Sequence, residues 1–184
     1  MVDSDLLSQD GHGSANSLRP PDEAVVSIIR TAEELKEALH IRQRVFVEGL
    51  GVPLDEEIDA YDGGGDPQKV AQDVVHVLAH MNGKAVGTGR LLINPPIRQL
   101  PKAQRISVLD EAQGKGVGRR IMLSLQEQAW ARGFRGVILD AQLKAIPFYE
   151  KLGYKVKGDV FLDAGIEHKK MELVFGGGAS LNNE

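Results

Sequence analysis

The stretch that decides the fold is Arg105-Ile106-Ser107-Val108-Leu109-Asp110-Glu111-Ala112-Gln113-Gly114-Lys115-Gly116-Val117-Gly118. It begins with an apolar run that predicts a strand and ends in a glycine-rich turn. The apolar residues that follow recur at helical spacing: Val117, Ile121, Leu125 and Ala129. Glycines let a backbone approach a ligand, and the N–H groups and dipole of a helix start attract an anion. We therefore predict a pyrophosphate site beside the cations Lys115, Arg119 and Arg120.

This turn matches neither of two common nucleotide-binding patterns. A P-loop requires Gly-Lys-Ser or Gly-Lys-Thr, which the sequence lacks, and the dinucleotide pattern fails because Ile121 occupies its third glycine position. An ordinary glycine-rich helix start is the alternative that the turn alone leaves open.

Outward from the turn, the chain predicts strands and helices in alternation. Asn82-Gly83 between apolar runs indicates a hairpin, and Thr31-x-x-Glu34 is a capping box that opens a helix through about Val47. A second helix would end at Gly133, and a short one would carry Pro147 in its first turn. The predicted strands are residues 25–30, 74–80, 85–93, 104–109, 137–141, 154–162 and 168–175. Residues 49–72 would form a long functional loop.

Length and composition predict one domain at residues 24–175, with a flexible leader at 1–23 and a flexible tail at 176–184 of the 184 residues. The net charge of −4 argues against a nucleic-acid partner, and the apolar runs are too short to span a membrane. The N-terminus lacks the features of a targeting segment, so we expect a cytoplasmic protein, with the nucleus not excluded. The absence of cysteine excludes an acyl-enzyme on a thiol.

No metal site is predicted. His76 and His80 have the spacing of paired zinc ligands on a helix, but they fall in a predicted strand. Four residues of a strand span about 13 Å, which is too far for one ion to bind both side chains.

Two motifs at a matching separation carry a family resemblance. Gln113-x-x-Gly116-x-Gly118 resembles the Arg/Gln-x-x-Gly-x-Gly/Ala signature of the GNAT superfamily of N-acetyltransferases. Phe148-Tyr149-Glu150-Lys151-Leu152-Gly153-Tyr154 resembles a second element of that superfamily. Further segments are similar to its ElaA/YjcF-like branch: Arg42-x-x-Val45-Phe46-Val47, Glu57-x-Asp59, Gly87-Thr88-Gly89-Arg90-Leu91, Leu139-Asp140-Ala141-Gln142 and Gly165-Ile166-x-His168-x-x-Met171.

The resemblance implies an α/β (α+β) acyl-CoA N-acyltransferase fold: a mixed, mostly antiparallel twisted sheet, flanked by helices and split between its fourth and fifth strands. Acetyl-CoA would lie in the split, with its pantetheine arm beside Ile106 and Val108. The pyrophosphate would lie on the turn formed by Gln113, Gly114, Lys115, Gly116, Val117 and Gly118, with Arg119 beside it. Gln142, where many members carry Asn, would bind the cofactor, and Tyr149 would protonate the departing thiolate.

An amine acceptor must lose a proton before it attacks. A pKa near 10 leaves about one amine in a thousand neutral at pH 7, which costs roughly 4 kcal/mol without a base. Glu57 and Asp59 are the predicted catalytic carboxylates, although a solvated acidic loop and water-mediated deprotonation stay open. Arg42, Arg90 and His168 are predicted to line the substrate cleft.

The predicted function is acetyl transfer to the primary amine of a small molecule: a polyamine, an amino sugar or an amino-acid derivative. A protein lysine or N-terminus as the acceptor, and an acyl-CoA-binding sensor without turnover, are the alternatives. We expect a monomer or a homodimer.

Overall fold

The computed structural model describes residues 23–93 and 100–176, so most of the predicted leader and tail lies outside the described residues. Within this part of the chain, seven strands form one sheet in the order β1-β2-β3-β4-β5-β7-β6. The strands are β1 Val25–Ile28, β2 Val74–Met81, β3 Lys84–Leu92, β4 Lys102–Val108, β5 Gly136–Gln142, β6 Lys155–Asp163 and β7 Ile166–Val174. Among the pairs described, β4 and β5 run parallel and all the others antiparallel, which confirms the predicted mixed sheet.

Local sequence signals fix the ends of the main elements. Helix α1 (Ala32–Arg42) opens with the predicted capping box, in which both bonds between Thr31 and Glu34 form. Asn82 and Gly83 adopt φ values of 52° and 76°, as a tight hairpin turn requires. Helix α3 (Val117–Ala131) ends before Gly133, whose φ is 79°, and the short helix α4 (Ile146–Glu150) carries Pro147 in its first turn.

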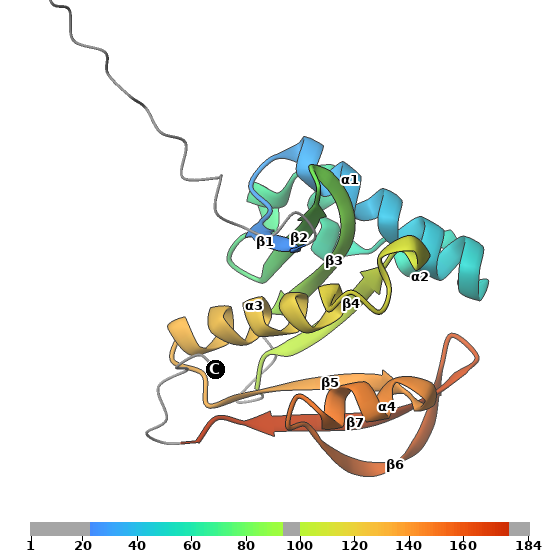
Figure 1. Ribbon diagram of the computed structural model, residues 1–184, viewed down its shortest axis with the longest axis vertical. Coiled ribbons are helices and arrows are strands. Elements are labelled where there is room, and N and C mark those ends of the chain that lie inside the picture. The colour runs from blue at the N-terminus through green and yellow to red at the C-terminus, as the bar shows by residue number, and fades with distance from the viewer. Residues whose placement is uncertain (1–22, 94–99, 177–184) are drawn as a thin grey trace, which may run out of the picture.

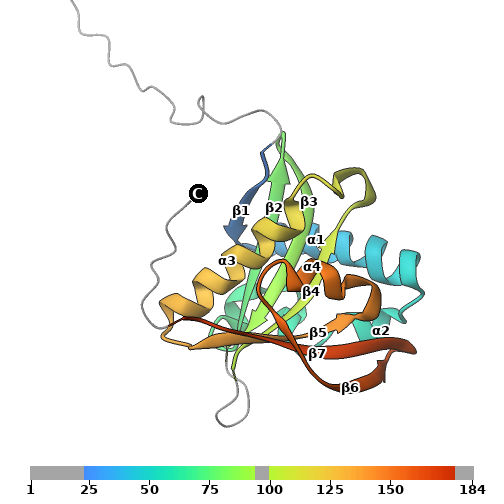
Figure 2. The same ribbon diagram turned by 60° about the horizontal axis from the view of Figure 1, so that its bottom comes forward.

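Helices α1 and α3 cover opposite faces of the strands β1 to β4 (Figures 1 and 2). Two glycines of β3 allow the close approach of α3. A Cβ at Gly87 would lie 2.9 Å from Ile121 Cδ1, and a Cβ at Gly89 would lie 2.8 Å from Ile121 Cγ2. Contacts this short do not occur between real atoms, so α3 packs directly on the backbone of β3. Helix α4 packs on β5 and β6.

The sheet divides between β4 and β5, as predicted. These strands pair only at Lys102 with Ile138 and Ala103 with Leu139, and beyond that point they diverge. The divergence separates a half that contains β1 to β4 from a half that contains β5 to β7 (Figure 1). Within residues 23–93 and 100–176, the edge of β4 from Gln104 onward therefore has no neighbouring strand on that side.

Residues 49–72, which were predicted as a long functional loop, are not irregular throughout. They contain three short helical turns: α2 (Leu54–Glu57), η2 (Ala60–Gly65) and η3 (Pro67–Val70). The side chains of Asp59 and Asp66 cap η2 and η3 by accepting bonds from Tyr61 N and Gln68 N. Before this segment, the end of the first helix continues as a π-helix, η1 (Gln43–Glu48). These turns are too short to produce a helical apolar period, so periodicity did not reveal them.

Two further 3-10 turns, η4 (Asp110–Ala112) and η5 (Leu143–Ala145), follow β4 and β5. None of the helices in residues 23–93 and 100–176 is both long and apolar enough to cross a membrane.

Candidate active site

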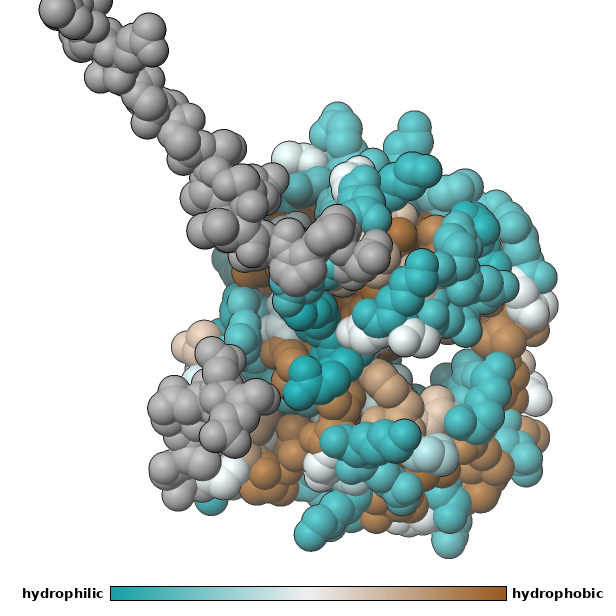
Figure 3. All heavy atoms as spheres, in the orientation of Figure 1, coloured by the Kyte–Doolittle hydropathy of each residue, from teal (hydrophilic) through white to brown (hydrophobic). Residues whose placement is uncertain are grey.

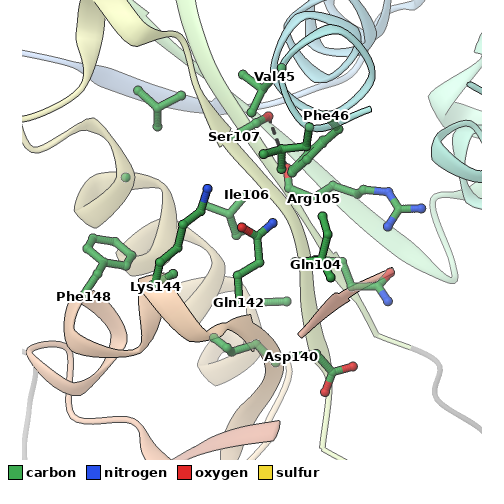
Figure 4. Close-up of a pocket in the computed structure, with 18 of the residues that line it drawn as sticks. Val45, Phe46, Gln104, Arg105, Ile106, Ser107, Asp140, Gln142, Lys144 and Phe148 are labelled. Carbon is green, nitrogen blue, oxygen red and sulfur yellow. Dashed lines mark hydrogen bonds between the residues drawn. The ribbon is translucent and has the colours of Figure 1, made fainter. Parts of the chain in front are cut away.

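A cavity of about 1020 Å³ passes through the split between β4 and β5. Figure 3 shows the surface deeply hollowed between the two halves of the molecule, and Figure 4 shows side chains of both strands in the opening. Its walls come from η1, α2, β4, the glycine turn, β5, α4 and β7. The cavity therefore reaches both faces of the sheet.

On the face of α3, the glycine turn forms an open cradle. Gly114 and Gly116 have φ values of 75° and 76°, and no atom lies within 4 Å of where a Cβ would stand at either residue. Helix α3 starts at Val117 without a side-chain cap, so the N–H groups of its first turn remain available. A pyrophosphate fits this combination of free donors, a helix dipole and an unobstructed backbone.

The side chain of Gln113 closes this turn. Its amide donates to Val108 O at 3.3 Å and to Asp110 Oδ1 at 2.9 Å. Gln113 lines the cavity, but its side-chain amide is used to stabilise the backbone between β4 and α3. Gln113 would therefore support an anion site by fixing the backbone conformation of the turn, and not by bonding the anion with its side chain.

The free edge of β4 supplies the wall next to the cradle. Ile106 faces α3, because its Cδ1 atom lies 2.8 Å from the position of a Cβ at Gly89. Val108 and Phe148 both approach Gly118, where an added Cβ would lie 3.9 and 3.3 Å from them. This apolar wall with unpaired backbone groups suits an extended arm that runs along the strand.

Tyr149 lies deep in the same wall, on α4. It is 9% exposed and packs edge-to-face against Phe148 and Tyr154, with ring centroids 4.9 and 5.9 Å away. Burial raises the pKa of Tyr149 to about 12. The phenol therefore keeps its proton throughout the neutral range and is available as a hydrogen-bond donor.

The opposite face of the split is polar. Alternation along β5 buries Val137, Leu139 and Ala141 and leaves Asp140 facing the cavity. The Nζ atom of Lys102 lies 2.5 Å from Asp140 Oδ2, while Asp140 Oδ1 is buried and has no hydrogen-bond partner among the described residues.

His168 of β7 also lines this polar face. Its Nδ1 atom is 2.8 Å from the carbonyl oxygen of Ile166. A carbonyl oxygen can only accept, so Nδ1 carries the proton, and in the neutral ring Nε2 is an acceptor that has no hydrogen-bond partner in the part of the chain that the structure describes. Phe161 stacks on the ring at 6.0 Å and fixes its plane.

Next to this face lies a group of three arginines and three carboxylates, four of them buried and two partly exposed, which we call the ion cluster: Arg42, Glu57, Asp59, Asp62, Arg90 and Arg105. Arg42 bonds Glu57 at 2.5 Å and Asp62 at 2.6 Å. Arg90 bonds Asp59 at 2.5 Å, and this contact holds the pKa of Asp59 below its usual range, against desolvation. The cluster fastens α2 and η2 to α1, β3 and β4.

Within the cluster, Glu57 has both carboxylate oxygens occupied. Oε1 accepts from Arg42 Nε at 2.5 Å, and Oε2 lies 3.0 Å from Arg105 Nε. Burial raises the pKa of Glu57, and the three neighbouring guanidinium groups oppose that rise.

The cavity brings together most of the residues predicted from the sequence. The lining includes Glu57, Ile106, Val108, Gln113, Gly114, Gly116, Val117, Gly118, Arg119, Gln142, Tyr149 and His168. Lys115 belongs to the same turn but is not part of the lining. Asp59, Arg42 and Arg90 are also absent from it, since they lie in the ion cluster behind the wall. This placement does not support direct contact of these three residues with a substrate.

Sequence reasoning missed Lys102, Gln104, Arg105 and Asp140, all of which line the cavity. The alternation of β5 was a usable signal for Asp140, since this residue has the same parity as Gln142. Arg105 gave no local signal. Its φ of 56° belongs to a bulge in β4 opposite β3, and its guanidinium reaches Glu56 O at 3.1 Å.

Comparison with known proteins agrees with this geometry. The family described as acetyltransferase (GNAT) domain matches residues 66–175. The Bacillus subtilis protein described as uncharacterized N-acetyltransferase YjcF is 38% identical over 145 residues, which cover 78% of this chain and 95% of that protein. A glucosamine 6-phosphate N-acetyltransferase from Trypanosoma brucei brucei is 33% identical over 95 residues, 49% of this chain and 65% of that protein.

Among solved structures, Escherichia coli ElaA superposes with a TM-score of 0.69 at 22% identity, covering 82% of this chain and 99% of ElaA. This likeness confirms the fold that the two sequence motifs predicted. The match to the family over residues 66–175 and the 38% identity to YjcF also show the family to which the chain belongs. The chain belongs to the GNAT family and is an acetyltransferase that uses acetyl-CoA as its acyl donor.

Proposed function

We propose that this acetyltransferase moves the acetyl group directly to the primary amine of a small molecule, within a ternary complex. The observation that carries the proposal is a continuous cavity through the split, with Tyr149 on one face and His168 on the other. Both reactants can meet in such a cavity without a covalent enzyme intermediate. The absence of cysteine from the chain agrees with direct transfer.

The polar face of the cavity, where the amine would bind, favours a compact acceptor. It includes Glu57 and Arg105, whose side chains the ion cluster holds, so these polar groups have fixed positions that a small molecule can match. The relative named glucosamine 6-phosphate N-acetyltransferase supports the same class of acceptor. A protein lysine or N-terminus, or binding without turnover, remains the alternative to be separated by experiment.

Bound acetyl-CoA supplies the thioester that an amine attacks with loss of the thiolate. In this proposal, Tyr149 donates a hydrogen bond to the departing sulfur; its position in the wall of the cavity and its retained proton support this role. With a pKa of about 12, its full transfer of a proton to a thiolate whose conjugate acid has a pKa near 8.5 is uphill by about 5 kcal/mol. We therefore assign to Tyr149 the stabilisation of the thiolate, and the proton that finally neutralises the sulfur comes from the amine by way of solvent.

His168 is the better candidate for the base. Its Nε2 atom is a free acceptor, whereas both oxygens of Glu57 are engaged by arginines and Asp59 does not line the cavity. His168 would take the proton that the attacking amine must lose. Glu57 would instead hold the wall in place.

The test is release of free thiol from acetyl-CoA in the presence of amines, polyamines, amino sugars and lysine peptides. Gly116→Glu places a carboxylate at the cradle, and Gly116→Ala is its matched control because both replace a residue with φ of 76°. We expect thiol release that depends on a small amine, and a Kd for acetyl-CoA at least tenfold higher in Gly116→Glu than in Gly116→Ala. Release with peptides alone would favour the protein acceptor, and binding without release would favour a sensor.

A further inference from the structure

The apex of the split carries a hydrogen-bonding site that the chemistry of acetyl transfer does not require. Gln104 of β4 and Asp140 of β5 both line the cavity just beyond the last paired residues of the two strands. Both belong to the polar face, opposite the wall that holds Ile106 and Tyr149. Figure 4 shows them below the level of Arg105, at the lower end of the opening.

Gln104 presents a donor to the cavity. Its Oε1 atom accepts a bond from Arg90 Nη2 at 3.1 Å. Because a guanidinium can only donate, this contact assigns the oxygen to Arg90 and leaves the NH₂ group of Gln104 for a ligand.

Asp140 presents an acceptor. Oδ2 is bonded by Lys102, whereas Oδ1 is buried without a hydrogen-bond partner among the described residues. A buried carboxylate oxygen without a donor is unfavourable, and rotation about the Cβ–Cγ bond moves either oxygen without moving the backbone. A small rotation that turns Oδ1 toward the cavity gives a ligand an acceptor and supplies this oxygen with a donor.

The charges on this face favour a neutral hydroxyl group over an ammonium group as the donor to Asp140. Lys102 neutralises Asp140, and Arg42 and Arg105 neutralise Glu57. The other carboxylates of the lining, Glu56, Asp110 and Asp163, are exposed to solvent. The apex thus offers one donor and one acceptor without an uncompensated negative charge. An alcohol both donates and accepts, whereas an ammonium group only donates.

We propose that Gln104 and Asp140 bind a hydroxyl group of the acceptor, so that the enzyme acetylates hydroxylated amines, such as amino alcohols and amino sugars, in preference to polyamines. The inference rests on the proposed function, since it names the acceptor class of the same cavity. Asp140 is then a specificity-determining residue, and Lys102 compensates its negative charge.

The test uses acceptors that differ only in one terminal group. In each matched set, a primary amine ends in methyl, hydroxyl or ammonium at the same chain length, as in butylamine, 3-aminopropanol and 1,3-diaminopropane, with chains from two to five carbons. Values of kcat/KM are expressed per neutral amine. We expect the hydroxyl compound to exceed its methyl partner at least tenfold at the best length, and Asp140→Ala to bring this ratio within twofold of one.

Further variants keep the test independent of folding. Asp140→Asn keeps the shape of the side chain and should also lower the ratio, and thermal unfolding verifies each variant. Glu172→Gln removes a carboxylate from the same face of the sheet, outside the cavity lining, and should keep the wild-type ratio. Lys102→Gln leaves Asp140 uncompensated and should raise the ratio of diamine to amino alcohol at least fivefold.

The outcomes separate the two proposals. An unchanged hydroxyl preference in Asp140→Ala, or a wild-type preference for the diamine, overturns the hydroxyl site and leaves acetylation of small amines standing. Binding of acetyl-CoA without acetylation of any amine overturns the proposed function and the hydroxyl site with it.

Discussion

At the scale of the residue, Tyr149 is expected to affect the departure of the thiolate more than the binding of acetyl-CoA. It is buried on α4, and burial raises its pKa to about 12. We expect Tyr149→Phe to lower kcat about a hundredfold, because the departing thiolate loses its hydrogen bond, while the Kd for acetyl-CoA changes less than threefold. Single-turnover rates and calorimetric binding measure the two quantities. A parallel loss of binding would instead assign Tyr149 to packing.

His168 makes a prediction about pH. If its Nε2 atom accepts the amine proton, His168→Gln should lower kcat/KM about a hundredfold at pH 7. The deficit should shrink as the pH rises toward 9.5, because each pH unit gives roughly tenfold more neutral amine below its pKa. His80→Gln, outside the cavity lining, is the control. A deficit that is constant with pH would indicate a role in binding alone.

Arg105 stores strain in the bulge of β4. Its φ of 56° costs about 1–2 kcal/mol in a residue with a Cβ. Arg105→Ala and Arg105→Gly both lose the guanidinium, but only glycine removes the strain. We expect the glycine variant to be more stable than the alanine variant by about 1 kcal/mol in urea unfolding, although glycine normally weakens a strand. The usual order, with alanine more stable, would contradict the bulge geometry.

At the scale of the element, the ion cluster decides whether α2 and η2 stay in place. Arg42→Met would leave Glu57 and Asp62 buried without their main partner, at a cost of about 3–5 kcal/mol. Arg44→Met, two residues along, removes a solvent-exposed contact with Glu111 and should leave the unfolding midpoint near that of the wild type. Urea unfolding of both variants tests the prediction. An equal loss of stability in the two variants would contradict it.

The same cluster explains which elements the sequence could predict. The capping box at Thr31, the Asn82-Gly83 turn and the end of α3 at Gly133 depend on neighbours within a few residues, so their signals were local and were confirmed. The turns α2 and η2 depend on Arg42, Arg90 and Arg105, which are far away in the chain. No local pattern reports these ion pairs, and the one local signal, the Asp59-x-x-Asp62 cap of η2, stands among so many acidic residues that the segment was predicted as a loop.

At the scale of the whole molecule, the same division holds for the site. The donor cradle lies within one strand–turn–helix unit, so its glycines were visible as a motif. The amine face is assembled from β4, β5, β7 and α2, and the pairing of Lys102 with Asp140 depends on where two strands diverge. Asp59 was predicted as a catalytic carboxylate and Arg90 as a substrate contact because their charges were visible in the sequence, while their pairing with each other was not.

Stability against pH is a property of the whole molecule that His76 should dominate near neutrality. His76 is buried on β2, where its Nε2 atom lies 2.8 Å from Tyr61 O, and burial lowers its pKa. Below pH 6.5, the unfolded chain binds a proton at this residue and the folded chain does not. The free energy of unfolding therefore falls as the pH falls, with a slope of up to about 1.4 kcal/mol per unit, until the lowered pKa is reached.

A substitution isolates this contribution. His76→Gln keeps a donor for Tyr61 O but does not titrate, so between pH 6.5 and 5.5 it should lose about 1 kcal/mol less stability than the wild type. Glu57, whose pKa burial raises, acts in the opposite direction, but both proteins contain it and its contribution cancels. His40→Gln replaces an exposed histidine and should follow the wild type. Urea unfolding at several pH values gives the slopes, and equal slopes for the wild type and His76→Gln would show that His76 takes up its proton in the folded protein.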